Sequence, residues 1–317
     1  MQLYFAPMEG ITGREYRLAH QRWFGGVDKY YAPFISPTCD HLFTPKEKRN
    51  LFPEFNPGVP LVPQLLAKNP DDFTWAADAL FDMGYEEVNL NVGCPSATVV
   101  TKGKGSGLLK NPDVLNEFLY EIFRKARGSI SVKTRLGMTD PEEFHRILSI
   151  YSRYPISLLI IHPRTRMDYY KEPIRMAYFD QAMADYKGEL CFNGGIVSPA
   201  GFDCFTAAHP GIDRVMMGMG LLADPALALK IKGTGTLTRE ALRGFHDQLY
   251  YGYLDTFHSE KNAVFHMKEL WLFLQRNFDE GEKLFKQIKK AQNAAAYEPA
   301  VEEIFRSLPL RKSANWE

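Results

Sequence analysis

The sequence predicts an α/β protein that folds as a (β/α)8 TIM barrel and continues into a small all-α helical bundle. Three observations support this prediction. Short β-rich runs alternate with helical patterns over roughly the first 235 residues, which is the length and rhythm of such a barrel. Pairs of an N-cap residue and a proline recur between these runs. Beyond Gly233–Thr236 the strand signal stops, and only amphipathic helical patterns follow.

Eight short apolar runs are the predicted strands. They lie at residues 3–6, 28–34, 61–67, 87–92, 129–136, 157–162, 189–194 and 213–218. A doubly wound open sheet has the same alternation of strands and helices, and it is the alternative architecture. The polar, proline-interrupted stretch 38–58 is expected to be an excursion outside the core.

Five helices are predicted to begin where an N-cap residue precedes a proline. Proline suits the first helical position because its missing N–H would have no partner there. Apolar residues then recur at spacings of three and four, as in Phe118, Ile122 and Phe123. The five pairs are Asn69-Pro70, Asn111-Pro112, Asp140-Pro141, Ser198-Pro199 and Asp224-Pro225.

The last part of the chain contains four apolar stripes with helical spacing. They begin at Leu242, Val264, Leu284 and Val301, and the third is expected to run to Ala295. We therefore predict two domains, a barrel over 1–236 and a helical domain over 237–317. Acidic residues are interspersed among the lysines and arginines of the helical domain, which is typical of a solvated surface; a docking face is the alternative.

Composition excludes several classes of protein. Because 38 basic and 38 acidic residues give a net charge of zero, a surface devoted as a whole to nucleic acid is not expected, and local patches would have to make any such contact. No apolar run approaches about 18 residues, and no signal peptide is recognisable, so we expect a cytoplasmic protein without a membrane span. The four cysteines lie far apart without a C-x-x-C spacing, which favours reduced thiols over disulfides or a metal site.

The strand at 87–92 leads directly into the candidate catalytic residue, Cys94. Barrels place their chemistry at the carboxyl ends of the strands, where this thiol lies. A loop with Lys102, Lys104 and several glycines follows it and gives the thiol a basic, mobile surrounding. The alternative is that Cys94 is a small buried hydrophobic residue, as free cysteines usually are.

Other polar residues end the remaining strands and should converge on the same barrel mouth. The Gly-containing turns after the last two strands occupy the position of a phosphate site common to many barrels. Because neither a metal cluster nor a Ser-His-Asp arrangement is present in this set, it favours a phosphorylated, planar cofactor, and flavin mononucleotide (FMN) fits that description. The set comprises Pro7, Met8, Glu9, Gln64, Asn91, Lys133, Arg135, His162, Arg164, Arg166, Asn193, Gly194, Gly195, Gly218 and Met219.

Taken together, these motifs resemble the tRNA-dihydrouridine synthase family. The resemblance runs in order from about Phe5 to Pro225 and agrees with the helical tail. It rests on APMEGIT near the start, Gln64, NLNVGCPS with the downstream GKGSGLLKNP, SVKTRLG, IHPRTR, NGGI and MMGMG.

The resemblance implies a flavin-dependent oxidoreductase that binds FMN, accepts hydride from NADPH and reduces the C5–C6 double bond of particular tRNA uridines. Hydride would pass from the reduced flavin N5 to uracil C6 while Cys94 delivers a proton to C5. The helical domain would grip the tRNA body, the target base would leave its stack, and we expect a monomer. The expected FMN contacts are Pro7, Met8, Glu9, Gln64, Lys133, His162, Asn193, Gly194, Gly195, Gly218 and Met219; the expected substrate contacts are Asn91, Lys102, Lys104, Arg135, Arg164 and Arg166.

Two departures from the family pattern stand out. The family commonly has Gly-Arg where this chain has Gly218-Met219, so one cationic contact to the FMN phosphate is missing. The helical domain also has about as many acids as bases, where a tRNA-binding domain is usually basic. Two other functions remain open: an FMN barrel that reduces a free pyrimidine or another small enone, and a non-catalytic RNA-binding protein on a barrel scaffold.

Overall fold

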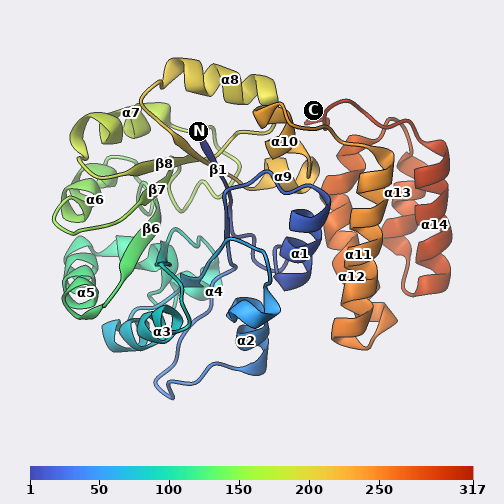
Figure 1. Ribbon diagram of the computed structural model, residues 1–317. Helices are drawn as coiled ribbons and strands as arrows, with labels where there is room; N and C mark the ends of the chain where they lie inside the picture. The colour runs from blue at the N-terminus through green and yellow to red at the C-terminus, as the bar shows by residue number, and fades with distance from the viewer. Residues whose placement is uncertain (317) are drawn as a thin grey trace.

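The computed structural model describes residues 1–316 and contains one sheet of nine parallel strands. The order of the strands is β3-β2-β1-β9-β8-β7-β6-β5-β4, and helices surround the sheet (Figure 1). The predicted TIM barrel is therefore confirmed, and the open-sheet alternative is wrong. The strands are β1 (Gln2–Phe5), β2 (Lys29–Tyr31), β3 (Leu61–Val62), β4 (Gln64–Leu65), β5 (Glu87–Val92), β6 (Ser129–Arg135), β7 (Leu159–His162), β8 (Leu190–Asn193) and β9 (Arg214–Met217).

The ninth strand arises because Pro63 divides the third predicted strand. On one side of it, Val62 of β3 pairs with Tyr31 of β2, and on the other side Gln64 of β4 pairs with Asn89 of β5. Proline has no N–H to give to the ladder, but the Pro63 carbonyl still accepts the Asn89 N–H at 2.8 Å. The two halves therefore act as one strand, and they close the barrel.

Helices pack around the barrel between successive strands (Figure 1). Three of the five predicted helix starts are confirmed. Asn69, Asn111 and Ser198 each cap a helix with a side-chain oxygen that accepts a backbone N–H of the first turn. The main helices of this part are α1 (Arg14–Trp23), α3 (Pro70–Asp82), α5 (Pro112–Lys125), α6 (Glu143–Tyr151), α7 (Met176–Asp185), α8 (Pro199–Ala208), α9 (Met219–Ala223) and α10 (Leu227–Lys232).

The other two predicted starts are wrong by two residues, since α6 begins at Glu143 and α10 at Leu227. At both places the backbone carbonyl of the aspartate accepts the N–H three residues further on: Asp140 accepts from Glu143 at 3.1 Å, and Asp224 accepts from Leu227 at 2.9 Å. At the three confirmed starts the corresponding carbonyl accepts the N–H four residues further on. The two segments therefore begin with a tighter turn, and the α-helix starts after it.

The excursion at 38–58 contains α2 (Pro45–Leu51) and a 3-10 turn at Pro53–Phe55. A capping box between Thr44 and Glu47 starts α2. Leu51 at its end is fully buried in the core. The stretch was expected to stay outside the core, and that expectation is wrong for this residue. Two further short elements, α4 (Ala97–Val100) and a 3-10 segment at Gly105–Lys110, follow β5.

Four helices form the last part of the chain: α11 (Arg239–Phe257), α12 (Glu260–Leu274), α13 (Glu282–Lys290) and α14 (Ala294–Ser307). They lie beside α1 and α9 (Figure 1). The third predicted stripe is divided, because α13 ends at Lys290 and Ala295 belongs to α14. The four-helix pattern is otherwise as predicted, while the boundary between two domains at 236 and 237 stays a prediction.

Ring contacts and hydrogen bonds join the helical part to the barrel. Tyr16 of α1 meets Phe245 of α11 edge to face at 5.4 Å, and the Trp23 indole N–H donates to the Gln248 side chain at 2.9 Å. The Asn277 amide donates to the carbonyl of Ala223 at the end of α9. These contacts stabilise one relative placement of the two parts.

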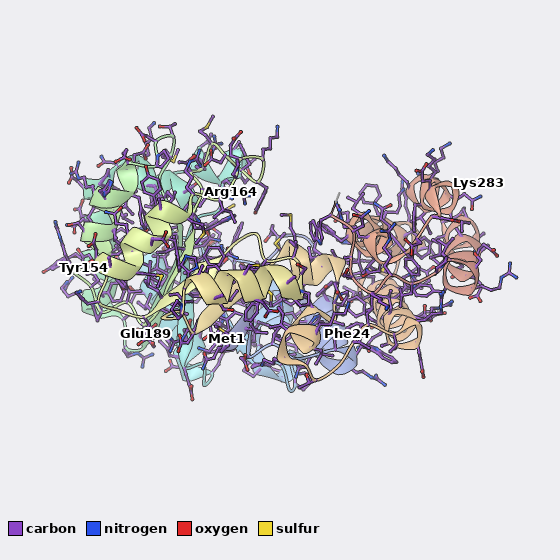
Figure 2. The ribbon with its side chains drawn as sticks, turned by 90° about the horizontal axis from the view of Figure 1, so that it is seen from above. Met1, Phe24, Tyr154, Arg164, Glu189 and Lys283 are labelled. Carbon is purple, nitrogen blue, oxygen red and sulfur yellow. The ribbon has the colours of Figure 1, made fainter. Side chains whose placement is uncertain are left out.

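Seen from above, the labelled Arg164, after β7, and Lys283, in α13, lie toward the same side of the molecule (Figure 2). Met1 and Glu189, which precede β1 and β8, lie toward the opposite side. Lys283 of α13 therefore lies on the same side of the molecule as the carboxyl ends of the strands. Within residues 1–316, no helix has the length and apolar character required to cross a membrane.

A buried histidine links α1 to the barrel. The Tyr30 hydroxyl lies 2.6 Å from His20 Nδ1, and the Pro225 carbonyl lies 3.0 Å from Nε2. Since a carbonyl can only accept, Nε2 carries the proton and Nδ1 accepts from Tyr30. Burial lowers the pKa of His20 to about 3, although the Pro225 carbonyl raises it. The ring is therefore neutral in the folded protein near neutral pH.

We predict that acidification destabilises the fold through His20. The unfolded chain binds a proton near pH 6.5, whereas the folded chain binds it only near pH 3. The unfolding free energy should therefore fall as the pH drops through this window, by about 1.4 kcal/mol per pH unit for this group. Urea unfolding of the wild type and of His20→Gln, measured at a series of pH values, checks this: the variant should have a shallower pH slope, and equal slopes would contradict the assignment.

Candidate active site

Two adjoining cavities open at the carboxyl ends of the strands. The first, of about 610 Å³, is lined by residues that follow β1, β7, β8 and β9, and the second, of about 810 Å³, by residues near the ends of β1, β2, β4, β5 and β6. Five residues line both cavities, so the two are parts of one mouth: Pro7, Met8, Lys133, His162 and Tyr170.

Glycine backbone forms one wall of the first cavity. Gly194 and Gly195 have φ of 140° and 66°, which favour glycine. A Cβ on Gly194 would lie 3.1 Å from His162 Cδ2, and one on Gly218 would lie 3.2 Å from Met8 Sδ. The absence of side chains therefore lets a ligand approach the main chain closely, as a phosphorylated group requires.

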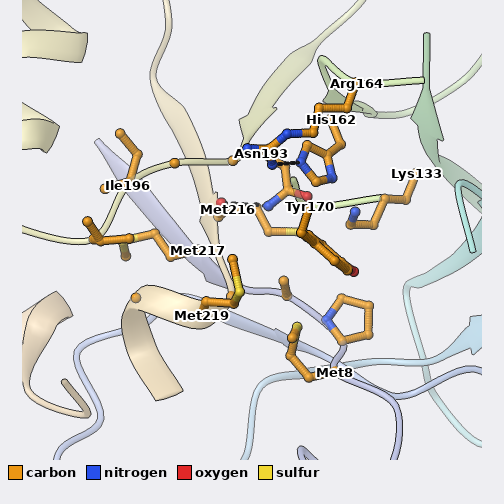
Figure 3. Close-up of a pocket in the computed structure, with 17 residues that line it drawn as sticks. Met8, Lys133, His162, Arg164, Tyr170, Asn193, Ile196, Met216, Met217 and Met219 are labelled. Atoms are coloured by element: carbon orange, nitrogen blue, oxygen red, sulfur yellow. Dashed lines mark hydrogen bonds between the residues drawn. The ribbon is translucent and has the colours of Figure 1, made fainter. Parts of the chain in front are cut away.

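Lys133, His162 and Asn193 point into this cavity, opposite Met8 and Met219 (Figure 3). The Asn193 amide donates to the Met216 carbonyl at 2.9 Å, which fixes its orientation. Burial, together with the charge of Arg135, lowers the pKa of Lys133 to about 7.

His162 is neutral in this surrounding. Burial holds its pKa well below the ordinary value, and the charges of Arg135, Lys133 and Arg164 lower it further. Its Nε2 lies 3.0 Å from Nη1 of Arg164 (Figure 3). Because a guanidinium only donates, Nε2 accepts, and Nδ1 carries the hydrogen.

The first cavity fits an FMN molecule in its chemistry. Its glycine backbone can approach a phosphate, Lys133 and Arg164 bring positive charge, and the amide and imidazole groups can bind polar ring edges. The apolar side chain of Met8 offers a surface for a planar ring.

Cys94 lies in the second cavity, in a turn whose backbone is held from both sides. The Asn91 side-chain oxygen accepts the N–H groups of Gly93 and Cys94. On the other side, the Cys94 carbonyl accepts from the Ser106 N–H at 3.1 Å and from its hydroxyl at 2.8 Å. The backbone of the turn that carries the thiol is therefore held in place from both sides.

Burial raises the pKa of Cys94, and the nearby Glu9 carboxylate raises it further, while the Ser96 N–H, Arg135 and Lys133 act in the opposite direction. The thiol is thus protonated at neutral pH. A protonated thiol is a proton donor, whereas a nucleophilic cysteine needs a depressed pKa.

A chain of buried side-chain hydrogen bonds runs beneath Cys94. The Asn91 amide donates to Gln64 Oε1 at 2.8 Å, Gln64 Nε2 donates to Asn89 Oδ1 at 2.7 Å, and Asn89 Nδ2 donates to Ser131 Oγ at 2.7 Å. The chain sets the orientation of every amide in it. Gln64 therefore has one remaining N–H for a ligand. Asn89 and Ser131 were missed from the sequence, although their spacing of two from Asn91 and Lys133 places them on the same inward face.

Arg135 connects the two loops that carry the site. Its side chain is almost fully buried; Nε donates to the Gly93 carbonyl at 2.9 Å, and Nη1 donates to the carbonyls of Thr165 and Tyr169 at 2.9 and 2.8 Å. The Cys94 turn is thereby tied to the loop after β7. Arg166 adds a second tie, from its Nε to the Pro95 carbonyl at 3.1 Å.

Tyr170 is a further residue that the sequence did not reveal. Its ring lies in the first cavity (Figure 3). The centre of the ring is 5.9 Å from the centre of the His162 ring and 5.3 Å from the guanidinium carbon of Arg135. The ring is about half exposed (48%), so it can pack against a ligand. The adjacent aromatic pair Tyr169-Tyr170 was the available signal, but only the folded loop shows which ring faces the cavity.

The predicted site residues divide among the two cavities and their rim, while their roles stay predictions. The first cavity is lined by Pro7, Met8, Lys133, His162, Arg164, Asn193, Gly194, Gly195, Gly218 and Met219. The second is lined by Pro7, Met8, Glu9, Gln64, Asn91, Cys94, Lys133, Arg135 and His162. The residues that line neither cavity are Lys102, Lys104 and Arg166. No cluster of His, Cys, Asp or Glu side chains suited to a metal ion occurs in the described part of the chain.

Comparison with known proteins decides the family. Residues 4–306 match the family model described as dihydrouridine synthase (Dus). The chain belongs to the dihydrouridine synthase family. It is accordingly an oxidoreductase, and the resemblance predicted from the motifs is confirmed.

Two curated relatives of this chain are named tRNA-dihydrouridine(16) synthase. The protein from Pseudomonas putida is 28% identical over 308 residues, which cover 93% of this chain and 94% of the relative. The protein from Cupriavidus necator is 29% identical over 240 residues, which cover 73% and 74%.

Solved structures share the barrel fold with this member of the dihydrouridine synthase family. The old yellow enzyme from Trypanosoma cruzi matches with a TM-score of 0.54 at 10% identity, covering 80% of this chain and 94% of that chain. Morphinone reductase matches with a TM-score of 0.52 at 11% identity, covering 77% and 88%.

We predict that Asn91→Ala destabilises the folded protein by about 1–3 kcal/mol, because the N–H groups of Gly93 and Cys94 lose their acceptor. Urea unfolding measures this. Asn262→Ala, at an exposed position of α12, is the matched control and should change the unfolding free energy by less than about 0.5 kcal/mol. Equal effects of the two substitutions would contradict the role of Asn91.

Proposed function

We propose that the protein is an FMN- and NADPH-dependent tRNA-dihydrouridine synthase. It reduces the C5–C6 double bond of a uridine in tRNA. The observation that carries the proposal is the protonated, backbone-fixed thiol of Cys94 in a cavity that adjoins a glycine-walled cavity with the chemistry for FMN. The names of the curated relatives support tRNA as the substrate.

A bound FMN would supply the hydride chemistry between NADPH and C6 of the uracil ring. The residues of the first cavity would hold it. Gly194, Gly195 and Gly218 offer their backbone to the phosphate, and His162 and Asn193 bind polar edges. Lys133 lies at the junction of both cavities, where it can meet the electron-rich end of the ring.

Cys94 supplies the proton that C5 of the uracil needs. As the double bond is reduced, the S–H bond breaks and a C–H bond forms at C5. The thiolate left behind is stabilised by the charges of Arg135 and Lys133, both of which lower the pKa of the thiol. It regains a proton from water before the next turnover.

The uridine enters the second cavity, which opens beside Cys94. Its base must first leave the RNA stack. Asn91 and Arg135 line this cavity, and Tyr170 offers a ring face between the two cavities. Because the two relatives are named for position 16, uridine 16 is the proposed target. The proposed enzyme acts in the cytoplasm as a monomer, and its helices α11–α14 contact the tRNA body.

Turnover on different substrates tests the proposal. The purified protein should oxidise NADPH in the presence of tRNA that lacks dihydrouridine, and should not do so with free uracil or a small enone. Turnover of the free base with none on tRNA would instead support the alternative, a reductase of small molecules. A protein that binds RNA but contains no flavin would be a non-catalytic binder.

We predict that Cys94→Ala separates the two halves of the reaction. The variant should keep bound FMN and its reduction by NADPH, because Cys94 does not line the first cavity. Its reduction of uridine should fall by about 10²–10⁴-fold, since the proton donor is gone. Cys204→Ala, an exposed cysteine on α8, is the control and should behave as the wild type. Uridine reduction at the wild-type rate in Cys94→Ala would contradict the assigned role.

We also predict that Met219→Arg strengthens FMN binding about tenfold, because a guanidinium at this edge of the first cavity gains a charge-assisted bond to the phosphate. Fluorescence titration of the flavin-free protein measures the affinity. Riboflavin, which lacks the phosphate, is the control ligand and should bind both proteins equally. An equal gain for both flavins, or none for FMN, would show that residue 219 does not face the phosphate.

A further inference from the structure

Three lysines from two loops gather beside the second cavity. Lys68 follows β4, and Lys102 and Lys104 lie in the loop after β5. Gly103, between the latter two, lies close to Lys68: a Cβ placed on it would be 3.7 Å from Lys68 Cδ. The stem of Lys68 therefore packs against the loop that carries the other two lysines.

Lys104 places this cluster at the rim of the cavity. Its Nζ lies 2.5 Å from the hydroxyl of Ser36, two residues beyond Phe34, which lines the second cavity. In its own loop, Lys104 lies two residues before Ser106, whose hydroxyl donates a hydrogen bond to the Cys94 carbonyl. The side chain thus bridges the loop of Cys94 and the loop after β2 at the edge of the cavity.

The cluster carries an excess of positive charge. Burial lowers the pKa of Lys104, and the charges of Lys102 and Lys68 lower it further, while Asp72 raises it. Asp72 is itself engaged, because its carboxylate lies 3.5 Å from His41 Nε2. An anion among the three ammonium groups would relieve their repulsion.

The position of the cluster selects the anion. The loops after β4 and β5, which carry the three lysines, lie across the barrel from the glycine turns after β8 and β9, so the cluster is remote from the proposed phosphate site of FMN. A nucleotide whose base enters the second cavity has its phosphates at the rim of that cavity. Since the chain has a net charge of zero, RNA binding depends on local patches of this kind.

We propose that Lys68, Lys102 and Lys104 together bind the phosphodiester group next to the target uridine. The inference rests on the proposed function and extends it to a specific RNA contact that includes Lys68. The three lysines hold the backbone while the base is turned into the cavity, and Ser36 keeps Lys104 in place.

The test is the binding of a tRNA transcript that lacks dihydrouridine to Lys68→Gln/Lys102→Gln/Lys104→Gln. The affinity at physiological salt should fall on the order of tenfold, and the slope of log affinity against log salt should become shallower by about one unit for each lost phosphate contact. Bound FMN and its reduction by NADPH should stay as in the wild type, which checks that the variant is folded.

Arg127→Gln/Arg153→Gln/Lys187→Gln is the matched control. It removes the same charge from the segments that lead into β6, β7 and β8, at the opposite end of the barrel. Its affinity for the transcript should be close to that of the wild type. A loss equal to that of the lysine variant would overturn the inference, because it would show a general effect of net charge.

NADPH also carries phosphate groups and is the alternative ligand of the lysine cluster. The second part of the test is therefore the KM for NADPH of each variant. An unchanged KM supports RNA as the ligand, whereas a raised KM with unaltered RNA binding overturns the inference. Wild-type affinity and salt slope in the lysine variant would also overturn it, even if the wild type makes dihydrouridine. If binding depends on the lysines but the wild type makes no dihydrouridine, the proposed function fails and the RNA contact stands.

Discussion

The site depends on one buried guanidinium. Arg135 leaves β6 and donates hydrogen bonds to the Gly93 carbonyl on one side and to the carbonyls of Thr165 and Tyr169 on the other. Loops are the most mobile parts of a barrel, and these two carry Cys94 and Tyr170. Burying a charge is costly unless its hydrogen bonds are made, so the guanidinium is stable only when both loops are in place. The same contact therefore stabilises the arginine and positions the two sides of the mouth.

The barrel could be predicted because its signals are local. An apolar strand run or an N-cap residue with proline is recognised from a few neighbouring residues. Strands that alternate with helices over this length are compatible with few architectures. The errors arose where a second local interaction competes. The carbonyls of Asp140 and Asp224 form tighter turns with the N–H three residues on, so the α-helix starts later. Pro63 interrupts a ladder that continues on both sides of it.

The candidate site was predictable as far as strand ends converge. Cys94, Lys133 and His162 follow from that rule alone. The rest depends on contacts between distant segments. The Ser131 hydroxyl meets Asn89 across 42 positions of the sequence, and Lys68 reaches Gly103 only after two loops have folded together. A spacing of two shows which face Asn89 and Ser131 share, but not which partner each meets, and Lys68 has no such signal, so these contacts required the structure.

Together, these contacts hold a protonated thiol beside the proposed flavin site. The amide chain and Arg135 fix the Cys94 turn, burial keeps its thiol protonated, and the adjoining glycine-walled cavity has the chemistry for the flavin. The most direct test is the mass of nuclease fragments from a tRNA transcript after incubation with the purified protein, FMN and NADPH. One uridine, at position 16, should gain the mass of two hydrogen atoms. Consumption of NADPH with every fragment unchanged in mass would contradict the account.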